Sequence, residues 1–133
     1  MRRVVFDTNV WVSGIAFEGE VRRVILGAME SQIYLAISPA LLEELERVLL
    51  RRKFGYEPAM VSAILSEVQT LAHLVHPKQI IHAIKDDPAD NRVLECALES
   101  RAEFIVSGDN HLLKLGSYMG IKIVSPKVFL NIT

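Results

Sequence analysis

The stretch VVFDTNVWVSG, residues 4–14, joins three apolar residues directly to an aspartate and two small polar residues. The apolar run at 4–6 is short, rich in β-branched side chains and without alternation, which is typical of a strand buried on both faces of a sheet. Asp7 follows at the point where that strand ends. The stretch therefore predicts a buried strand that carries a carboxylate at its carboxyl end.

Similar apolar runs recur at residues 33–37, 74–75, 104–106 and 121–124. Helical patterns lie between them, at residues 21–30, after Ser38 and Pro39, at 57–74, from Pro88, and in short segments after Asp109 and Pro126. Strands that alternate with helices predict an α/β fold with a parallel sheet covered on both faces. Such sheets bind ligands beyond the carboxyl ends of their strands, which directs attention to the residues that follow each apolar run.

The composition limits the classes of function. A chain of 133 residues, half of them hydrophobic, predicts a single domain over residues 1–133. Its net charge of −1 means that a polyanion must meet a local basic patch or a bound metal. The single cysteine excludes a disulfide framework and a CxxC metal motif. No secretory signal or membrane span is visible, so we expect a cytoplasmic protein without a membrane partner.

Two aspartates follow predicted strands at the same edge of the sheet. Asp7 follows the first run, and Asp109 follows the run at 104–106 after Ser107 and Gly108. For either residue alone, a turn or helix-cap role is the preferred interpretation. Their common position at the functional edge favours a shared site.

Asp90 lies on the apolar side of its predicted helix. On a helical wheel it falls within the stripe that Val93, Leu94 and Ala97 define. The alternative is a capping box with Asp87, aided by the helix dipole. A buried carboxylate needs a partner, and no Lys or Arg is placed by the sequence to supply one. A cation shared with Asp7 would do so.

The helix after Pro39 carries three glutamates. Glu43 points away from the apolar stripe and pairs with Arg47 four residues on, so it is interpreted as surface. Glu44 and Glu46 flank the stripe on opposite sides, and periodicity does not choose between them. The arginines on the flank of Glu44 favour it modestly.

These carboxylates predict a metal site. Crowded carboxylates repel one another, and their pKa values rise unless a cation compensates them. Oxygen ligands suit Mg²⁺ or Mn²⁺, and such ions activate water for the cleavage of phosphodiesters. The candidate cluster is Asp7, Glu44, Asp90 and Asp109.

Four motifs in order resemble the PIN domain family, the small nuclease fold of VapC-type toxins. VVFDTNVWVSG is similar to its first strand and acid, ISPALLEEL to its second motif, DDPADNRVLECALE to its third and FIVSGDNHLL to its last. IKIVSPKVFL resembles the closing strand and helix of a subgroup of toxins of toxin–antitoxin pairs. The resemblance covers the whole chain, and in the second motif it aligns on Glu44.

The resemblance implies a three-layer α/β/α fold with a five-stranded parallel sheet. It implies that Asp7, Glu44, Asp90 and Asp109 form the acidic pocket, with Asp7, Asp90 and Asp109 as ligands of Mg²⁺ or Mn²⁺. Ser107 would orient an acid or water, and Asn9 would brace the pocket. Thr8 and Asn9 would turn the chain after the strand. An antitoxin partner and a homodimer are implied on the same basis.

Other residues carry weaker predictions. Arg47 and Arg51 belong to the densest basic run and are candidates for phosphate contacts with RNA. Trp11 could stack a base, although packing in the core or at a subunit contact is favoured. His111 is near Asp109 and could touch substrate, but a surface position is the preferred interpretation.

We therefore interpret the chain as a Mg²⁺- or Mn²⁺-dependent endoribonuclease and the toxin of a toxin–antitoxin pair. Alternatives within the same fold are an RNA-processing nuclease, a DNA-directed nuclease and a non-catalytic binding module. A phosphotransfer module is disfavoured. Asp7 has no neighbouring acid of the kind that response-regulator receivers use, and Asn9 occupies the position where haloacid-dehalogenase phosphatases place a second aspartate.

Overall fold

The computed structural model describes residues 2–17, 20–30 and 33–132. The strands are β1 (Arg3–Phe6), β2 (Tyr34–Ile37), β3 (His73–Leu74), β4 (Phe104–Val106), β5 (Ser117–Tyr118) and β6 (Ile121–Val124). The helices are α1 (Thr8–Ala16), α2 (Glu20–Glu30), α3 (Pro39–Leu49), the 3₁₀ helix η1 (Arg52–Phe54), α4 (Pro58–Leu71), α5 (Asp90–Glu99), α6 (Asn110–Leu115) and α7 (Pro126–Ile132).

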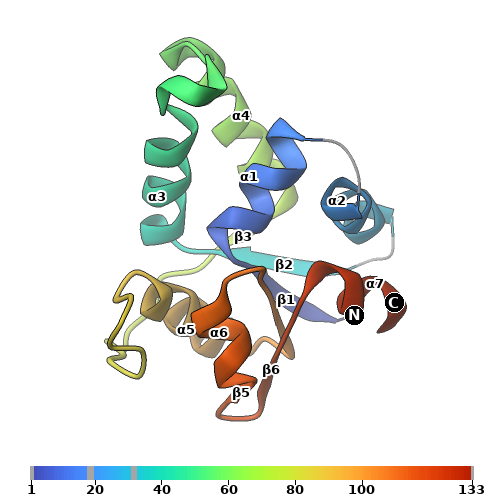
Figure 1. The fold of residues 1–133 in the computed structure, drawn as a ribbon, viewed down its shortest axis with the longest axis vertical. Helices are drawn as coiled ribbons and strands as arrows, with labels where there is room; N and C mark the ends of the chain where they lie inside the picture. Colours follow the sequence, from blue (N-terminus) through green and yellow to red (C-terminus); the bar gives the residue numbers. More distant parts are fainter. Residues whose placement is uncertain (1, 18–19, 31–32, 133) are drawn as a thin grey trace.

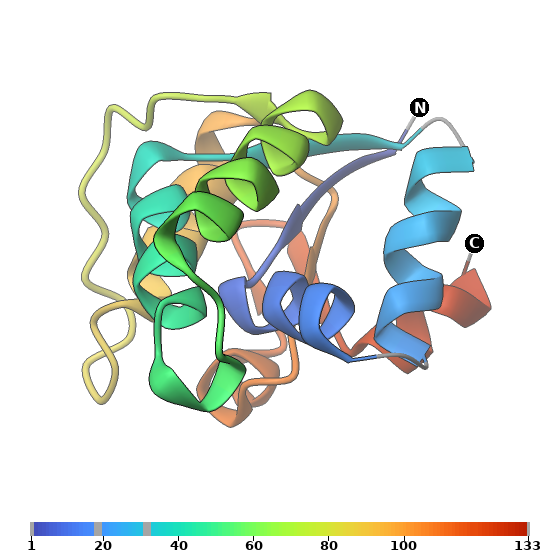
Figure 2. The same ribbon diagram turned by 90° about the horizontal axis from the view of Figure 1, so that it is seen from above.

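The strands form one sheet in the order β3-β2-β1-β4-β6-β5. Every neighbouring pair is parallel except β5 and β6. Helices α1 to α4 lie on one side of the sheet, while α5 and α6 lie on the other (Figures 1 and 2). The predicted α/β class, with a mostly parallel sheet between helices, is confirmed.

The predicted number of strands is wrong, because the sheet has six strands rather than five. The additional strand, β5, runs antiparallel to β6. The connection between them passes through Met119 and Gly120, both with positive φ (48° and 84°). A strand of two residues is too short to show a periodic pattern, which is why β5 was not predicted.

Helix α1 replaces the turn that was expected after Asp7. It begins at Thr8, and five of its nine residues are buried, among them Val10, Trp11 and Val12. Its polar face is narrow, so the sequence shows only a weak form of the amphipathic pattern by which helices are recognised. Trp11 packs in the core against Phe6, with ring centroids 5.2 Å apart.

The register of the sheet sets the position of the site. Phe6 of β1 is paired with Val106 of β4, so the residues that follow, Asp7 and Ser107, leave the sheet side by side. The Asp7 N–H donates to the Val106 carbonyl at 2.9 Å, which fixes the backbone at this point. The carboxyl edge of the two central strands thus presents Asp7 and Ser107 together.

Helix α3 starts as its sequence predicts. The Ser38 hydroxyl accepts a hydrogen bond from the Leu41 N–H at 3.3 Å, and Pro39 occupies the first turn. Because Ser38 follows β2 directly, α3 leaves the same edge of the sheet and passes beside α1. Within the described residues, no helix is long and apolar enough to cross a membrane.

Candidate metal centre

Asp7 is buried at the N-terminus of α1. Its side chain does not cap the helix. Instead, its Oδ2 accepts a hydrogen bond from the Ser107 hydroxyl at 2.7 Å, and the same hydroxyl accepts from the Asp109 N–H at 2.9 Å. Ser107 therefore connects the two aspartates that follow β1 and β4.

The surroundings of Asp7 disfavour its negative charge. The pKa of Asp7 is raised from 3.8 to about 6, chiefly by burial and also by the charges of Asp109 and Glu44, against the lowering effect of the Ser107 hydrogen bond. The carboxylate is thus ionised at neutral pH at a cost in free energy. A cation beside it would remove that cost.

Replacing Ser107 by Ala is expected to destabilise the protein more at high pH than at low pH. The hydroxyl donates to Asp7, and hydrogen bonds to ionised groups contribute about 1.5–3 kcal/mol, against about 1 kcal/mol for neutral ones. We expect a loss of about 2 kcal/mol at pH 8 and less than about 1 kcal/mol at pH 5 in urea unfolding with chelator present. Ser62→Ala, at an exposed position of α4, is the control. Equal losses at both pH values would contradict this role of Ser107.

Asp90 lies in the first turn of α5 and is only 6 % exposed, as its helical position predicts. One of its oxygens, Oδ2, is buried without a hydrogen-bond partner among the described residues. The capping box with Asp87 is not formed, because no side chain caps α5. Burial, followed by the charges of Asp109, Asp87 and Asp7, raises the pKa of Asp90 to about 8.

Asp109 has two kinds of contact. Its Oδ1 accepts hydrogen bonds from the backbone N–H groups of His111 (2.8 Å) and Leu112 (3.3 Å), and it caps α6 in this way. Its charge also raises the pKa values of Asp7 and Asp90, so the three carboxyl groups share one electrostatic environment. The cap and the candidate site are therefore roles of the same side chain.

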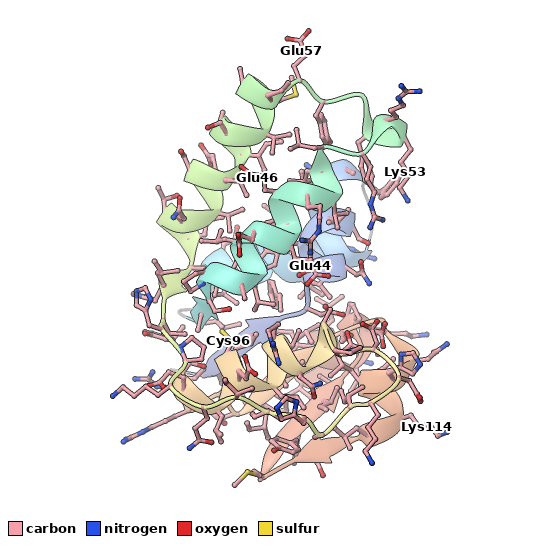
Figure 3. The ribbon with its side chains drawn as sticks, turned by 90° about the vertical axis from the view of Figure 1, so that its left-hand side faces the viewer. Glu44, Glu46, Lys53, Glu57, Cys96 and Lys114 are labelled. Atoms are coloured by element: carbon pink, nitrogen blue, oxygen red, sulfur yellow. The ribbon has the colours of Figure 1, made fainter. Side chains whose placement is uncertain are left out.

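The helical wheel of α3 did not distinguish Glu44 from Glu46 as the candidate site residue, but the structure does. Glu44 is half-buried, and its Oε2 lies 3.4 Å from the Thr8 hydroxyl, which donates to it. Its charge acts on Asp7. Glu46 is exposed and lies on a different side of α3 (Figure 3). Of the two, Glu44 is the one beside the acidic cluster.

The donor set fits a hard divalent cation. Asp90 and Asp109 lie close together, and the charge of Asp7, which follows β1, acts on Asp90. One buried oxygen of Asp90 has no hydrogen-bond partner among the described residues to offset its desolvation. Such an oxygen is expensive to bury in a protein unless a cation or a proton compensates it. Asp7, Asp90 and Asp109 are the residues that could hold such an ion, and Glu44 lies next to them.

Two residues near the cluster were not predicted as part of the site. Asp87, Asp90, Asp109 and His111 each place one ligand atom within 4.8 Å of the others. The sequence carried a signal for both: Asp87 stands three residues before Asp90, and His111 stands two residues after Asp109. Each was interpreted by its local role, as a cap or as surface.

The remaining predicted residues lie at the surface. Asn9 is exposed on α1, and within the described chain its side chain forms no hydrogen bond that would brace the pocket. Arg47, in the last turn of α3, and Arg51, just beyond the helix, are both exposed. The basic run continues into η1, where Lys53 lies (Figure 3).

This fold and this cluster define an α/β protein with an acidic cluster, able to hold a cation, at the carboxyl edge of its sheet. The sequence model of the PIN domain family matches residues 3–111. The chain belongs to the PIN domain family, whose members are generally nucleases. The resemblance that the four motifs carry is confirmed.

The fold is also found among solved structures. A chain in the crystal structure of VapBC2 from Rickettsia felis, bound to a DNA fragment from their promoter, superposes with a TM-score of 0.65. The match covers 92 % of this chain and 98 % of that chain at 13 % sequence identity, so the likeness is one of fold. Comparison with curated proteins gave no significant match.

Proposed function

We propose that this chain is an endoribonuclease that uses Mg²⁺ or Mn²⁺ to hydrolyse RNA, and that it is the toxin of a toxin–antitoxin pair. The observation that carries the proposal is the buried, unpartnered oxygen of Asp90 beside Asp7 and Asp109. A carboxylate in this position is costly for the fold and useful for holding a cation.

The residues of the cluster divide into ion ligands and residues that orient them. Asp7, Asp90 and Asp109 would hold the ion, and Ser107 orients Asp7 through its 2.7 Å hydrogen bond. When bound, the divalent ion supplies an activated water and neutralises charge that develops on the phosphate and the leaving oxygen. Glu44, held by Thr8, would hold an ion or orient the attacking water.

RNA would approach an acidic site along basic residues. Arg47 and Arg51 lie on the same helix as Glu44 or just beyond it, exposed to solvent and free to contact phosphates. Contacts of this type give affinity without sequence preference, and their strength falls with salt. The net charge of −1 leaves this local patch and the bound ion as the attraction for RNA.

The proposed biological role rests on the family and on its structural neighbour. The VapBC2 chain is found in a toxin–antitoxin complex on promoter DNA, and the present chain shares its fold. We infer an antitoxin protein as partner, a homodimer as the assembly and the cytoplasm as the location. A short gene next to this one, encoding a protein that binds the chain and suppresses its nuclease activity, would support that role.

The purified chain is expected to cleave single-stranded RNA with Mn²⁺ or Mg²⁺ and to stop when a chelator is added. Glu44→Gln should lower the rate at least about tenfold, whereas the matched variant Glu46→Gln should leave it unchanged, because only Glu44 lies beside Asp7. Labelled RNA resolved on gels measures both rates. Equal rates for the two variants would contradict the assignment of Glu44.

The form of the products tests the chemistry. When water is the nucleophile, a 2′-deoxy substitution at the scissile nucleotide leaves cleavage intact, and no cyclic phosphate forms. A contaminating ribonuclease that uses the 2′-hydroxyl would fail on that substrate and would resist the chelator. Cleavage of DNA in preference to RNA would favour the DNA-directed alternative, and no cleavage of either would favour the binding module.

A further inference from the structure

The acidic cluster extends from Asp90 and Asp109 to two further residues, Asp87 and His111. Asp87 precedes α5, Asp90 is in its first turn, Asp109 caps α6 and His111 is in the first turn of α6. One ligand atom from each of these four residues lies within 4.8 Å of the other three. Three carboxylates and one imidazole from two separate parts of the chain therefore face a common point.

The distances from His111 to its two neighbouring carboxylates are too long for hydrogen bonds. His111 Nδ1 lies 3.8 Å from Asp90 Oδ2 and 3.7 Å from Asp109 Oδ1. Hydrogen bonds between nitrogen and oxygen span about 2.7–3.2 Å. Ligands of one ion, each about 2.1 Å from it, lie at most about 4.2 Å apart. The two measured distances suit a shared ion, and a contraction of several tenths of an ångström would bring the whole set into range.

A second observation points to a ligand at the same place. Asp90 is 6 % exposed, and its Oδ2, the oxygen that faces His111, has no hydrogen-bond partner among the described residues. His111 itself is reachable from solvent, because its side chain is 45 % exposed. It also lines a cavity of about 460 Å³ together with Lys85, Asp86 and Lys114. An ion could enter from this cavity.

We propose that Asp87 and His111 are metal ligands, which together with Asp90 and Asp109 form a site that prefers a divalent transition-metal ion such as Mn²⁺ to Mg²⁺. The inference rests on the proposed function, because Asp90 and Asp109 belong to the proposed metal centre, and it adds two ligands to that centre. A neutral imidazole nitrogen suits transition metals, whereas Mg²⁺ prefers oxygen ligands alone. His111 thereby selects the metal.

Binding of Mn²⁺ to the full chain, after removal of metals with a chelator, tests the proposal without any substrate. Electron spin echo spectra of bound Mn²⁺ are expected to show coupling to an imidazole nitrogen in the parent protein. In titration calorimetry, His111→Gln should weaken Mn²⁺ binding at least about tenfold and Mg²⁺ binding less than about threefold. Asp87→Asn should weaken the binding of both ions, because it removes an oxygen ligand.

His76→Gln is the matched control, since His76 is an exposed histidine away from the cluster. It should keep the nitrogen coupling and both affinities. A parent protein that binds Mn²⁺ without nitrogen coupling, or that binds no Mn²⁺, overturns the proposal, and neither result depends on whether a variant folds. Coupling that persists in His111→Gln overturns the assignment of His111.

The two proposals fail in different ways. Nitrogen-coupled Mn²⁺ in a chain that cleaves no nucleic acid would contradict the nuclease function and leave the metal ligands established. RNA cleavage that needs metal, combined with Mn²⁺ spectra free of imidazole coupling, would support the nuclease and overturn the role of His111. In that second case His111 would be a neighbouring charge or a surface residue.

Discussion

Asp7→Asn is expected to lower metal-dependent RNA cleavage at least about 10³-fold while the protein remains folded. The carboxylate is buried, and the register of β1 and β4 places it near Asp109 and Glu44. A bound ion contributes several kcal/mol to catalysis, and each 1.4 kcal/mol corresponds to a factor of ten in rate.

Asparagine is a sharp test because it removes the charge and keeps the shape. Its side-chain oxygen can still accept the hydrogen bond that Ser107 donates, so the carboxyl edge of the sheet should be preserved. A loss of activity therefore reports the missing ligand rather than a damaged fold. Circular dichroism and Mn²⁺ titration of the variant separate the two.

Glu57→Gln is the control for this experiment. Glu57 is an exposed glutamate just before α4 (Figure 3), and its replacement changes the net charge by the same amount. The control variant should cleave RNA at the parental rate. If Asp7→Asn also retained that rate, Asp7 would be a structural residue and the proposed centre would lack its first ligand.

The fold was predictable because its signals are local. The buried strands are apolar runs with little alternation, and Ser38 with Pro39 marks the start of α3. The position of Asp7 follows from the same pattern, since the residue after a buried parallel strand lies at the carboxyl edge. The burial of Asp90 followed from its place on the helical wheel.

The features that could not be predicted from the sequence depend on contacts between segments that are distant along the chain. Glu44 and Glu46 are equivalent on the wheel of α3, and only the arrival of Thr8 beside Glu44 distinguishes them. Helix α1 has only a narrow polar face, so its amphipathic pattern is weak in the sequence. His111 faces Asp90 across a gap between α6 and α5, which neighbouring positions in the sequence do not reveal.

In the absence of metal, Asp90→Asn is expected to stabilise the protein, by an amount that grows with pH. The unfolded aspartate ionises near pH 3.8, whereas in the folded chain the pKa of Asp90 is about 8 and that of Asp7 about 6. Between these values the folded state binds more protons than the unfolded state, so the free energy of unfolding falls as pH rises. The parent should therefore lose stability from about pH 4 to pH 8.

Asp90→Asn should remove the largest part of this pH-dependent loss of stability, because the asparagine side chain is neutral at every pH. We expect a gain on the order of 2 kcal/mol at pH 8 and almost none at pH 4, measured by urea unfolding with chelator present. The control variant Glu57→Gln should follow the parental curve. Saturating Mn²⁺ should make the parent the more stable of the two proteins. An ion at 100 times its dissociation constant adds about 2.7 kcal/mol to the free energy of unfolding of the parent, and it adds less to the variant, which lacks a ligand.

The opposite result without metal would contradict the proposal. If the metal-free variant were less stable than the parent at pH 8, the Asp90 carboxylate would be compensated within the fold. The main reason to place a cation beside it would then be lost.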